Sequence, residues 1–527
     1  MAAIITNQLR ILNSKNFISG ISSSQDSYYM FVGLTNSSEY DPNWSSSPIA
    51  PKDNFDEENS YWDTMIALKK INSEDARQVI RRINWESGTT YDMYRHDISR
   101  DTTSKPSGST NLYSSNFYVV NRDYRVYICL YNGISPENPN GKPSLDEPTF
   151  TDLEPKSAGA SGDGYLWKYL YTITPTEITK FVTEEYIPVP KNWETSAENA
   201  TVRNNATNSG QLKIGIVTDR GSGLGNANIT YTNVPIKGDG SDATATITIN
   251  NDSKVESITI SNGGSGYTYG SVDLEGGNVP TGTIRPKFDV IIPPKGGHGF
   301  DIYRELGAYR TMVYSRLEND TNNPDFIVGN SIARIGIVQN PEKYQSNEKL
   351  TDSVVSALGA LKLVGPSGNV DLYKNVSFTA NSQIQQTIGT GVTAVGRVIS
   401  YDANTGVLKY WQDRNLVGFN TNGTRNTSPQ YGFEMQEFTS YPTGTGSFAI
   451  VGGSSELLID VNFGTIANPG ISTALNNRTY NLGQSFVRGV SSPEVKKYSG
   501  SIIYVDNRAA ITRSPNQKED IKVILQF

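Results

Sequence analysis

Histidine and cysteine, which often carry out catalysis, are scarce in this sequence, whereas Asp and Glu are plentiful and no pair of them stands out. It contains two histidines, His96 and His298, and a single cysteine, Cys129. The zinc-binding patterns CxxC and HExxH, the nucleophile pattern GxSxG and the phosphate-binding pattern GxxxxGKS/T are all absent. We therefore predict that the protein is not an enzyme and needs no metal or other cofactor.

The surroundings of these residues favour structural roles. His298 stands in the run Gly296-Gly-His-Gly299, where a glycine turn with a polar histidine is a simpler interpretation than a metal or catalytic site. Cys129 lies in the apolar run Val126-Tyr-Ile-Cys-Leu130 and is expected to be a small core residue. A lone cysteine cannot form an internal disulfide, which fits synthesis in a reducing cytoplasm.

Two glycine–aspartate segments resemble fragments of calcium-binding loops. They are Gly162-Asp-Gly164 and Gly238-Asp-Gly-Ser-Asp242. Neither continues into the full spacing of an EF-hand loop. We predict that each is a tight turn, in which glycine adopts a positive φ and the aspartate caps the turn.

Aromatic residues alternate along one expected strand, Tyr165–Ile173. Successive side chains of a strand point to opposite faces, so rings at alternate positions share one face. The four rings belong to Tyr165, Trp167, Tyr169 and Tyr171. An exposed platform for carbohydrate is one interpretation. A packed interface between sheets or subunits is the favoured one, because aromatic residues dominate cores and interfaces.

Charge and hydropathy exclude two classes of partner. The formal net charge is −7 at pH 7, and no basic patch suggests contact with nucleic acid. No apolar run approaches the ~18 residues that a membrane-spanning helix requires. We expect neither a nucleic-acid partner nor a membrane span.

The local patterns predict mostly strands and turns. A hairpin is expected from Phe117–Val120 and Tyr124–Leu130, with its turn at Asn121-Arg-Asp123. The C-terminal segment Ser499–Phe527 is expected to form two strands around a turn at Asp506-Asn-Arg508.

Short helices are expected in three places near the N-terminus. They are residues 1–20, Tyr61–Leu68 and Glu74–Ile80. In the last of these, Asn72 or Ser73 would cap a helix with an acidic first turn, which suits the helix dipole.

The amino-acid composition changes several times along the chain. Residues 194–293 and 354–489 are dominated by Gly, Asn and Thr, and strands such as Ala243–Ile249 alternate strictly within them. We interpret them as two inserted small β-domains in a discontinuous scaffold. The predicted order is scaffold 1–193, insert 194–293, scaffold 294–353, insert 354–489 and scaffold 490–527.

Motifs in the scaffold resemble those of one family. Gly162-Asp-Gly-Tyr-Leu-Trp-Lys-Tyr-Leu170, followed by Glu185-Tyr-Ile-Pro-Val-Pro190, is similar to a signature of the dimeric baseplate wedge protein of T-even-like contractile-tailed phages. The C-terminal Gly500-Ser-Ile-Ile-Tyr-Val-Asp-Asn-Arg508 agrees with that family's last motif, and the two inserts resemble the long form found in phages of marine cyanobacteria. The residues that carry the resemblance are Gly162, Asp163, Gly164, Tyr165, Trp167, Tyr169, Tyr186, Tyr504, Asn507 and Arg508.

The resemblance implies a fold and a function. The fold would be mainly β, a discontinuous β-sandwich with a few short helices, and the ten motif residues would serve structure. The protein would sit in the virion tail baseplate after assembly in the host cytoplasm, as a homodimer among other wedge subunits. It would contribute to wedge assembly and to the change that triggers sheath contraction. A receptor- or carbohydrate-binding tail protein is the alternative, and a tail depolymerase is a weaker one.

Overall fold

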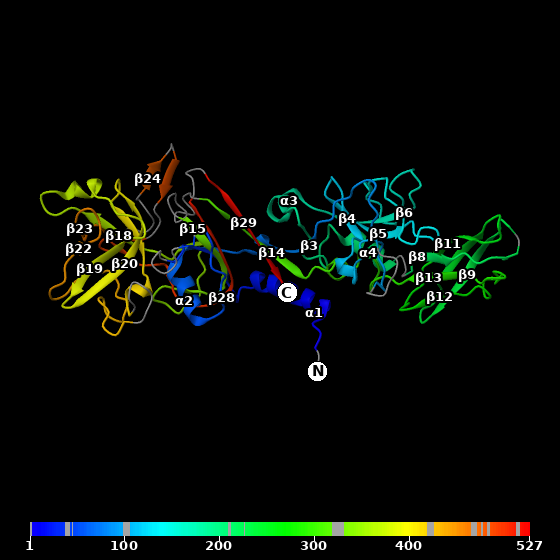
Figure 1. Cartoon of the computed structure of the whole chain (residues 1–527), viewed down its shortest axis with the longest axis horizontal. Coiled ribbons are helices and arrows are strands. Elements are labelled where there is room, and N and C mark those ends of the chain that lie inside the picture. The colour runs from blue at the N-terminus through cyan, green and yellow to red at the C-terminus, as the bar shows by residue number, and fades with distance from the viewer. Residues whose placement is uncertain are drawn as a thin grey trace. The chain divides into compact units, whose positions relative to one another are not determined.

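The computed structural model shows a chain built mainly of short antiparallel strands (Figure 1). Strands hold 37% of the residues and helices 13%, so the predicted mainly-β class is confirmed. The structure describes residues 3–36, 43–44, 46–98, 106–208, 212–225, 227–318, 331–418, 426–464, 472–475, 478–481, 485–512 and 517–527.

The chain forms two compact units, which are described separately. Unit 1 comprises Met1–Ile18, Ala76–Val313 and Val523–Phe527, and unit 2 comprises Ser19–Asp75 and Tyr314–Lys522. Each unit has apolar clusters of its own. The domain boundaries expected from composition remain predictions.

The predicted hairpin of unit 1 is confirmed. Strand β5 (Arg125–Asn132) is the centre of a three-stranded sheet, between β4 (Tyr118–Val120) and β6 (Tyr165–Thr172). β4 and β5 are antiparallel neighbours. The carbonyl oxygen of the Asn121 side chain accepts hydrogen bonds from two backbone amides of the turn, which fixes its conformation.

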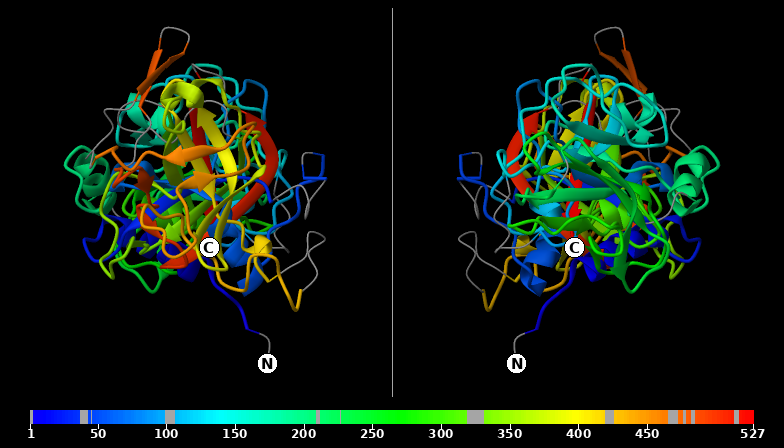
Figure 2. Two further views of the ribbon diagram at one scale, coloured as in Figure 1. Left: turned by 90° about the vertical axis from the view of Figure 1, so that its left-hand side faces the viewer. Right: turned by 90° about the vertical axis from the view of Figure 1, so that its right-hand side faces the viewer.

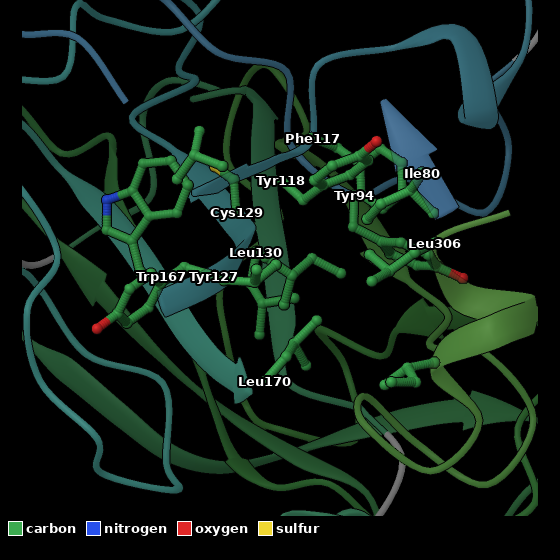
Figure 3. Close-up of a cluster of buried hydrophobic side chains, with 14 of the residues drawn as sticks. Ile80, Tyr94, Phe117, Tyr118, Tyr127, Cys129, Leu130, Trp167, Leu170 and Leu306 are labelled. Atoms are coloured by element: carbon green, nitrogen blue, oxygen red, sulfur yellow. The ribbon is translucent and has the colours of Figure 1, made fainter. Parts of the chain in front are cut away.

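This sheet contributes to the largest apolar core of unit 1. Figure 3 shows part of it, including Phe117, Cys129 and Trp167, all with 0% exposure. The expected core position of Cys129 is therefore confirmed, and burial raises the pKa of its thiol. Four core residues come from the stretch expected to be the first insert: Val202, Ile214, Ile216 and Ile291.

The helix expected at Glu74–Ile80 is wrong. A 3-10 turn at Ser73–Asp75 is followed by strand β3 (Ala76–Arg81). β3 pairs on one edge with β7 (Tyr186–Pro188) and on the other with the first four residues of β14 (Arg310–Leu317). Backbone pairing on both edges outweighs the local capping and dipole signals that favoured a helix.

The Gly- and Thr-rich part of unit 1 forms a four-stranded sheet in the order β11-β10-β9-β12. In β10 (Thr244–Ile249), every second residue is buried, so the predicted alternation is confirmed. The other strands here are β8 (Ile214–Asp219), β9 (Thr230–Gly238), β11 (Val255–Asn262), β12 (Gly270–Val272) and β13 (Lys287–Ile291), of which β8 and β13 pair with each other.

Unit 2 contains a five-stranded sheet in the order β17-β2-β1-β15-β28, which joins segments far apart in the sequence. Its strands are β1 (Tyr28–Gly33), β2 (Met65–Lys70), β15 (Ser331–Gln339), β17 (Val354–Ser356) and β28 (Ser501–Thr512).

Two expectations in this sheet need correction. The helix expected at Tyr61–Leu68 is α2 (Phe55–Thr64), capped by Asn54, and Met65 begins β2 instead. Met65 to Leu68 are fully buried beside β1, so strand pairing there decides the conformation. The turn expected at Asp506–Arg508 is also wrong, since β28 continues through these residues paired with β15.

A second large sheet of unit 2 has the order β19-β20-β21-β18-β23-β22, and β26 also pairs with β18. An isolated bridge between Gln385 and Val451 brings its two ends together. Its yellow strands face the viewer in the left panel of Figure 2. The expected hairpin is confirmed as β20 (Val392–Asp402) and β21 (Val407–Trp411), with a turn that holds Gly406 at φ 69°. The other strands are β18 (Gly359–Val364), β19 (Gln383–Gly389), β22 (Ala449–Ile450), β23 (Leu457–Ile459) and β26 (Val490–Ser491).

The remaining elements are short. The helix expected near the N-terminus is α1 (Asn7–Ser22). The others are α3 (Pro175–Phe181), α4 (Ala200–Asn208), α5 (Ile302–Glu305), β16 (Glu342–Lys343), β24 (Ser472–Leu475), β25 (Arg478–Asn481), β27 (Val495–Lys496) and β29 (Glu519–Gln526).

Candidate functional site

The Gly162-Asp-Gly164 turn leads directly into β6. Both glycines have the expected positive φ, 72° for Gly162 and 88° for Gly164. Asp163 is almost buried, and its carboxylate accepts hydrogen bonds from the backbone amides of Tyr165 at 3.0 Å and Leu145 at 2.9 Å. The aspartate therefore caps the turn, as predicted, and ties it to a neighbouring loop.

A close backbone approach explains the second glycine. A Cβ atom at Gly164 would lie 3.1 Å from the Cα of Gly133, whereas one at Gly162 would meet nothing within 4 Å. Gly164 is therefore required by both conformation and space, and Gly162 by conformation alone.

The aromatic residues of β6 form part of the core. Tyr165 and Trp167 have 0% exposure, and their rings stack with centroids 5.3 Å apart. The Tyr165 hydroxyl donates to the carbonyl of Lys142 at 2.7 Å and accepts from the backbone amide of Tyr91 at 2.9 Å. These rings therefore pack inside the chain, and an exposed carbohydrate platform on this strand is excluded.

Strict alternation fails in the second half of β6. The register with β5 shifts at two places, which indicates β-bulges. As a result Tyr169 is only half-buried, with its hydroxyl 2.8 Å from the Thr172 hydroxyl, while its neighbour Lys168 is buried. Of the four rings expected on one face, those of Tyr165, Trp167 and Tyr171 are buried and that of Tyr169 is half-buried.

Lys168 is a buried charge that the sequence analysis did not single out. Its ammonium donates to the carbonyl of Leu153 at 2.6 Å and to the Asn205 side chain at 2.9 Å. Loss of hydration on burial lowers the pKa of Lys168 to about 8, against the attraction of Glu154 and Glu305. The lysine thereby fastens β6 to two segments on either side of it in sequence.

Tyr186 belongs to a different sheet of the same unit. It begins β7, and its backbone amide donates to the Thr183 hydroxyl at 3.0 Å. The guanidinium of Arg310 lies 5.7 Å from the centre of its ring. The adjacent Ile187 joins the core that contains Tyr165.

The three C-terminal motif residues, Tyr504, Asn507 and Arg508, lie on β28 in unit 2. Tyr504 is half-buried opposite Ile337. Asn507 accepts a hydrogen bond at 3.0 Å from Arg334, a fully buried arginine. The backbone carbonyl of Arg508 accepts from the Trp44 indole at 2.8 Å.

The Arg334 network is the second feature that sequence reasoning missed. Its guanidinium also donates to Asn36 at 2.8 Å and to the hydroxyl of Thr64, and lies between the rings of Trp44 and Tyr61, 4.8 Å and 5.0 Å from their centres. The signal was present in Arg334 itself, a charged residue inside the otherwise apolar run of β15.

Both histidines make local contacts in the described structure. His298 has 6% exposure, its Nδ1 lies 2.6 Å from the Glu305 carboxylate, and its ring meets that of Tyr94 edge-on. It is thus a buried turn residue and not an exposed imidazole. Nδ1 of His96 accepts from the Ile292 amide, and burial lowers the pKa of this histidine. Within the described ranges, no group of three or more His, Cys, Asp or Glu side chains could hold a metal ion.

Comparison with known proteins bears on this same segment. A family model described as Bacteriophage T4 Gp8 matches residues 153–207. The matched range contains the Gly162–Gly164 turn, β6 and Tyr186, and seven of the ten motif residues lie in it. Tyr504, Asn507 and Arg508 lie outside it.

The match indicates a relationship to a structural protein of the phage baseplate wedge, a component of the virion tail. A comparison with curated protein sequences gave no significant match. No helix in the described part of the chain is long and apolar enough to cross a membrane.

Proposed function

We propose that this chain is a structural subunit of the tail baseplate wedge in a contractile-tailed bacteriophage. It pairs with a second copy of itself in each wedge and binds other wedge subunits. The observation that carries the proposal is the family match over residues 153–207, the segment whose turn, aromatic strand and buried lysine are hydrogen-bonded into the core.

The role that follows is mechanical. The subunit assembles in the host cytoplasm, helps to hold the wedge in its arrangement before infection, and repacks against its neighbours when receptor binding triggers sheath contraction. Densely packed cores transmit displacement because they do not deform continuously. The fully buried aromatic cluster around Trp167 supplies such a core.

The position of the chain in a density map of the intact tail tests the proposal. We expect two copies in every wedge, and light scattering on the purified chain should give the mass of a dimer. Density for this chain in the tail fibres or the capsid would contradict the proposal. If the purified chain is a monomer and no paired copies are present in the wedge, the dimer part of the proposal is refuted and the baseplate location stands.

The segment that carries the motifs supports neither alternative function. The strand that suggested a sugar platform is buried, so it gives no support to a receptor-binding role. A depolymerase would lower the viscosity of host polysaccharide incubated with the purified protein. We expect no change in viscosity.

A further inference from the structure

Unit 2 contains a cavity that none of the motif residues lines. Its volume is about 710 Å³, within the usual range of small-molecule sites. Its walls come from β21, from a loop near residue 435, and from two segments at residues 344–347 and 492–498. The cavity therefore lies where the second Gly-rich stretch meets the strands that flank it.

One wall carries an indole N–H that makes no hydrogen bond to a described residue. Trp411, the last residue of β21, has 3% exposure and lines the cavity. Its indole N–H can only donate, and none of the described residues accepts a hydrogen bond from it. The indole nitrogen is not among the buried polar atoms that lack a partner, so it remains accessible, and a ligand oxygen in the cavity can accept its hydrogen bond.

Two other rings of the cavity wall are exposed. Phe433 has 67% exposure and Tyr498 has 53%. Tyr498 is held at φ 63°, a conformation that residues other than glycine seldom adopt. Its hydroxyl contacts Asp63, and the Arg414 guanidinium lies 4.9 Å from the centre of its ring. The ring is therefore fixed in place, although more than half of its surface is accessible.

The charges around the cavity balance. Arg414 pairs with Asp63 at 2.6 Å, and Lys496 pairs with Glu342 at 2.6 Å. The ammonium of Lys497 donates to a backbone carbonyl, and Glu437 contributes a carboxylate to the wall. Three basic side chains are thus matched by three carboxylates, which favours an uncharged ligand over an anion or a cation.

We propose that this cavity binds a neutral saccharide. A pyranose ring presents C–H groups, which lie favourably against the negative face of an aromatic ring such as Phe433 or Tyr498. Its hydroxyl groups accept a hydrogen bond from the Trp411 indole and donate to acceptors such as Glu437. This activity goes beyond the structural role of the wedge and does not depend on it.

The test uses the full-length protein and four named probes, the methyl glycosides of D-glucose, D-galactose, D-mannose and N-acetyl-D-glucosamine. Saturation-transfer NMR and titration calorimetry would detect binding. We expect at least one glycoside to bind with a dissociation constant in the millimolar range or tighter. A second arm with the matching oligosaccharide distinguishes a single sugar from one unit of a longer chain.

Variants connect the binding to the cavity. Trp411→Phe keeps a ring but removes the donor, and should weaken binding about fivefold to tenfold, as expected for one hydrogen bond. Phe433→Ala should weaken it further or abolish it. The control is Tyr269→Ala, which removes a ring of 62% exposure from unit 1 and should leave binding unchanged. Circular dichroism confirms that each variant is folded.

Three results would overturn the proposal. They are the absence of binding by all four glycosides, binding that survives both cavity variants, and density for a segment of another polypeptide in this cavity in the assembled tail. Failure here would leave the baseplate assignment untouched, because that assignment is tested by the position of the chain in the tail.

Discussion

At the scale of single residues, buried polar groups define the matched segment. Asp163, Tyr165 and Lys168 are each almost or fully buried, and each makes hydrogen bonds to backbone groups of other loops. Removing one partner of such a pair leaves the other unsatisfied in the interior, which costs more than the bond itself contributes.

Tyr165→Phe tests this idea. It leaves the carbonyl of Lys142 and the amide of Tyr91 without their partner, and should lower the free energy of unfolding by about 1–3 kcal/mol. Tyr169→Phe is the matched control, because its hydroxyl contacts only the exposed Thr172 hydroxyl; it should cost about 0.5 kcal/mol or less. Urea unfolding followed by tryptophan fluorescence measures both. Equal losses of stability in the two variants would contradict the proposed role of the Tyr165 hydroxyl.

Lys168 should make stability depend on pH. Its pKa falls from 10.5 to about 8 on folding, so between these values the unfolded chain binds more protons than the folded chain, and stability rises with pH. As the pH rises from about 8 to 10.5, the native protein should gain up to about 3 kcal/mol of unfolding free energy relative to Lys168→Met, which has no group that titrates at this position. Unfolding curves of both proteins at several pH values measure it, and parallel pH profiles would show that Lys168 is not perturbed.

At the scale of elements, pairing between distant segments decides what local patterns leave open. Glu74–Ile80 carries helix-capping signals, yet Ala76–Arg81 is a strand because β7 and β14 pair with its two edges. The Asp506-Asn-Arg508 run has turn-forming residues, yet it continues β28 because β15 offers a partner along its length.

Asn507→Ala probes the anchor of β28. The change removes an acceptor from the buried Arg334 guanidinium and should cost about 1.5–3 kcal/mol, the range for hydrogen bonds to charged groups. Arg508→Ala is its neighbour control: it loses only an exposed pair with Asp506 and keeps the backbone carbonyl that binds Trp44. It should cost about 1 kcal/mol or less. Denaturant midpoints measure the two costs, and a reversed order would refute the anchoring role of Asn507.

At the scale of the whole molecule, the first Gly-rich stretch is tied into the core of unit 1. Val202, Ile214, Ile216 and Ile291 pack with the scaffold residues. Ser222 follows β8 and Ile284 precedes β13, and these two residues pair through backbone hydrogen bonds. We therefore expect the separable part to lie between these two residues, although its apolar clusters also include Val217 and Val290.

Two deletions test this boundary. Deletion of residues 223–283, with an Asn-Gly turn joining Ser222 to Ile284, should leave unit 1 folded, because the four core residues and the β8–β13 pair are retained. Deletion of residues 194–293 should abolish folding of this unit, because it removes them. Near-ultraviolet circular dichroism of the aromatic core reports both outcomes. A folded product of the longer deletion would show that the stretch is an independent insert.

The sequence by itself determined the mainly-β class, the Asp163 turn, the hairpin around Asn121 and the core position of Cys129. Each depends on interactions within a few residues, such as a positive φ that glycine tolerates or strict alternation along a strand. The family resemblance also rested on short contiguous motifs, and the match over residues 153–207 falls on one of them.

Only the tertiary structure decided the strands at Met65–Lys70 and Ala76–Arg81, the burial of Lys168 and Arg334, and the cavity beside Trp411. These features depend on contacts beyond the local sequence, since Lys168 meets Asn205, Arg334 meets Asn36 and Asn507, and the cavity joins residues near 345, 411 and 498. Local propensities differ by less than the free energy of pairing and burial, so the partner that the fold supplies determines the outcome.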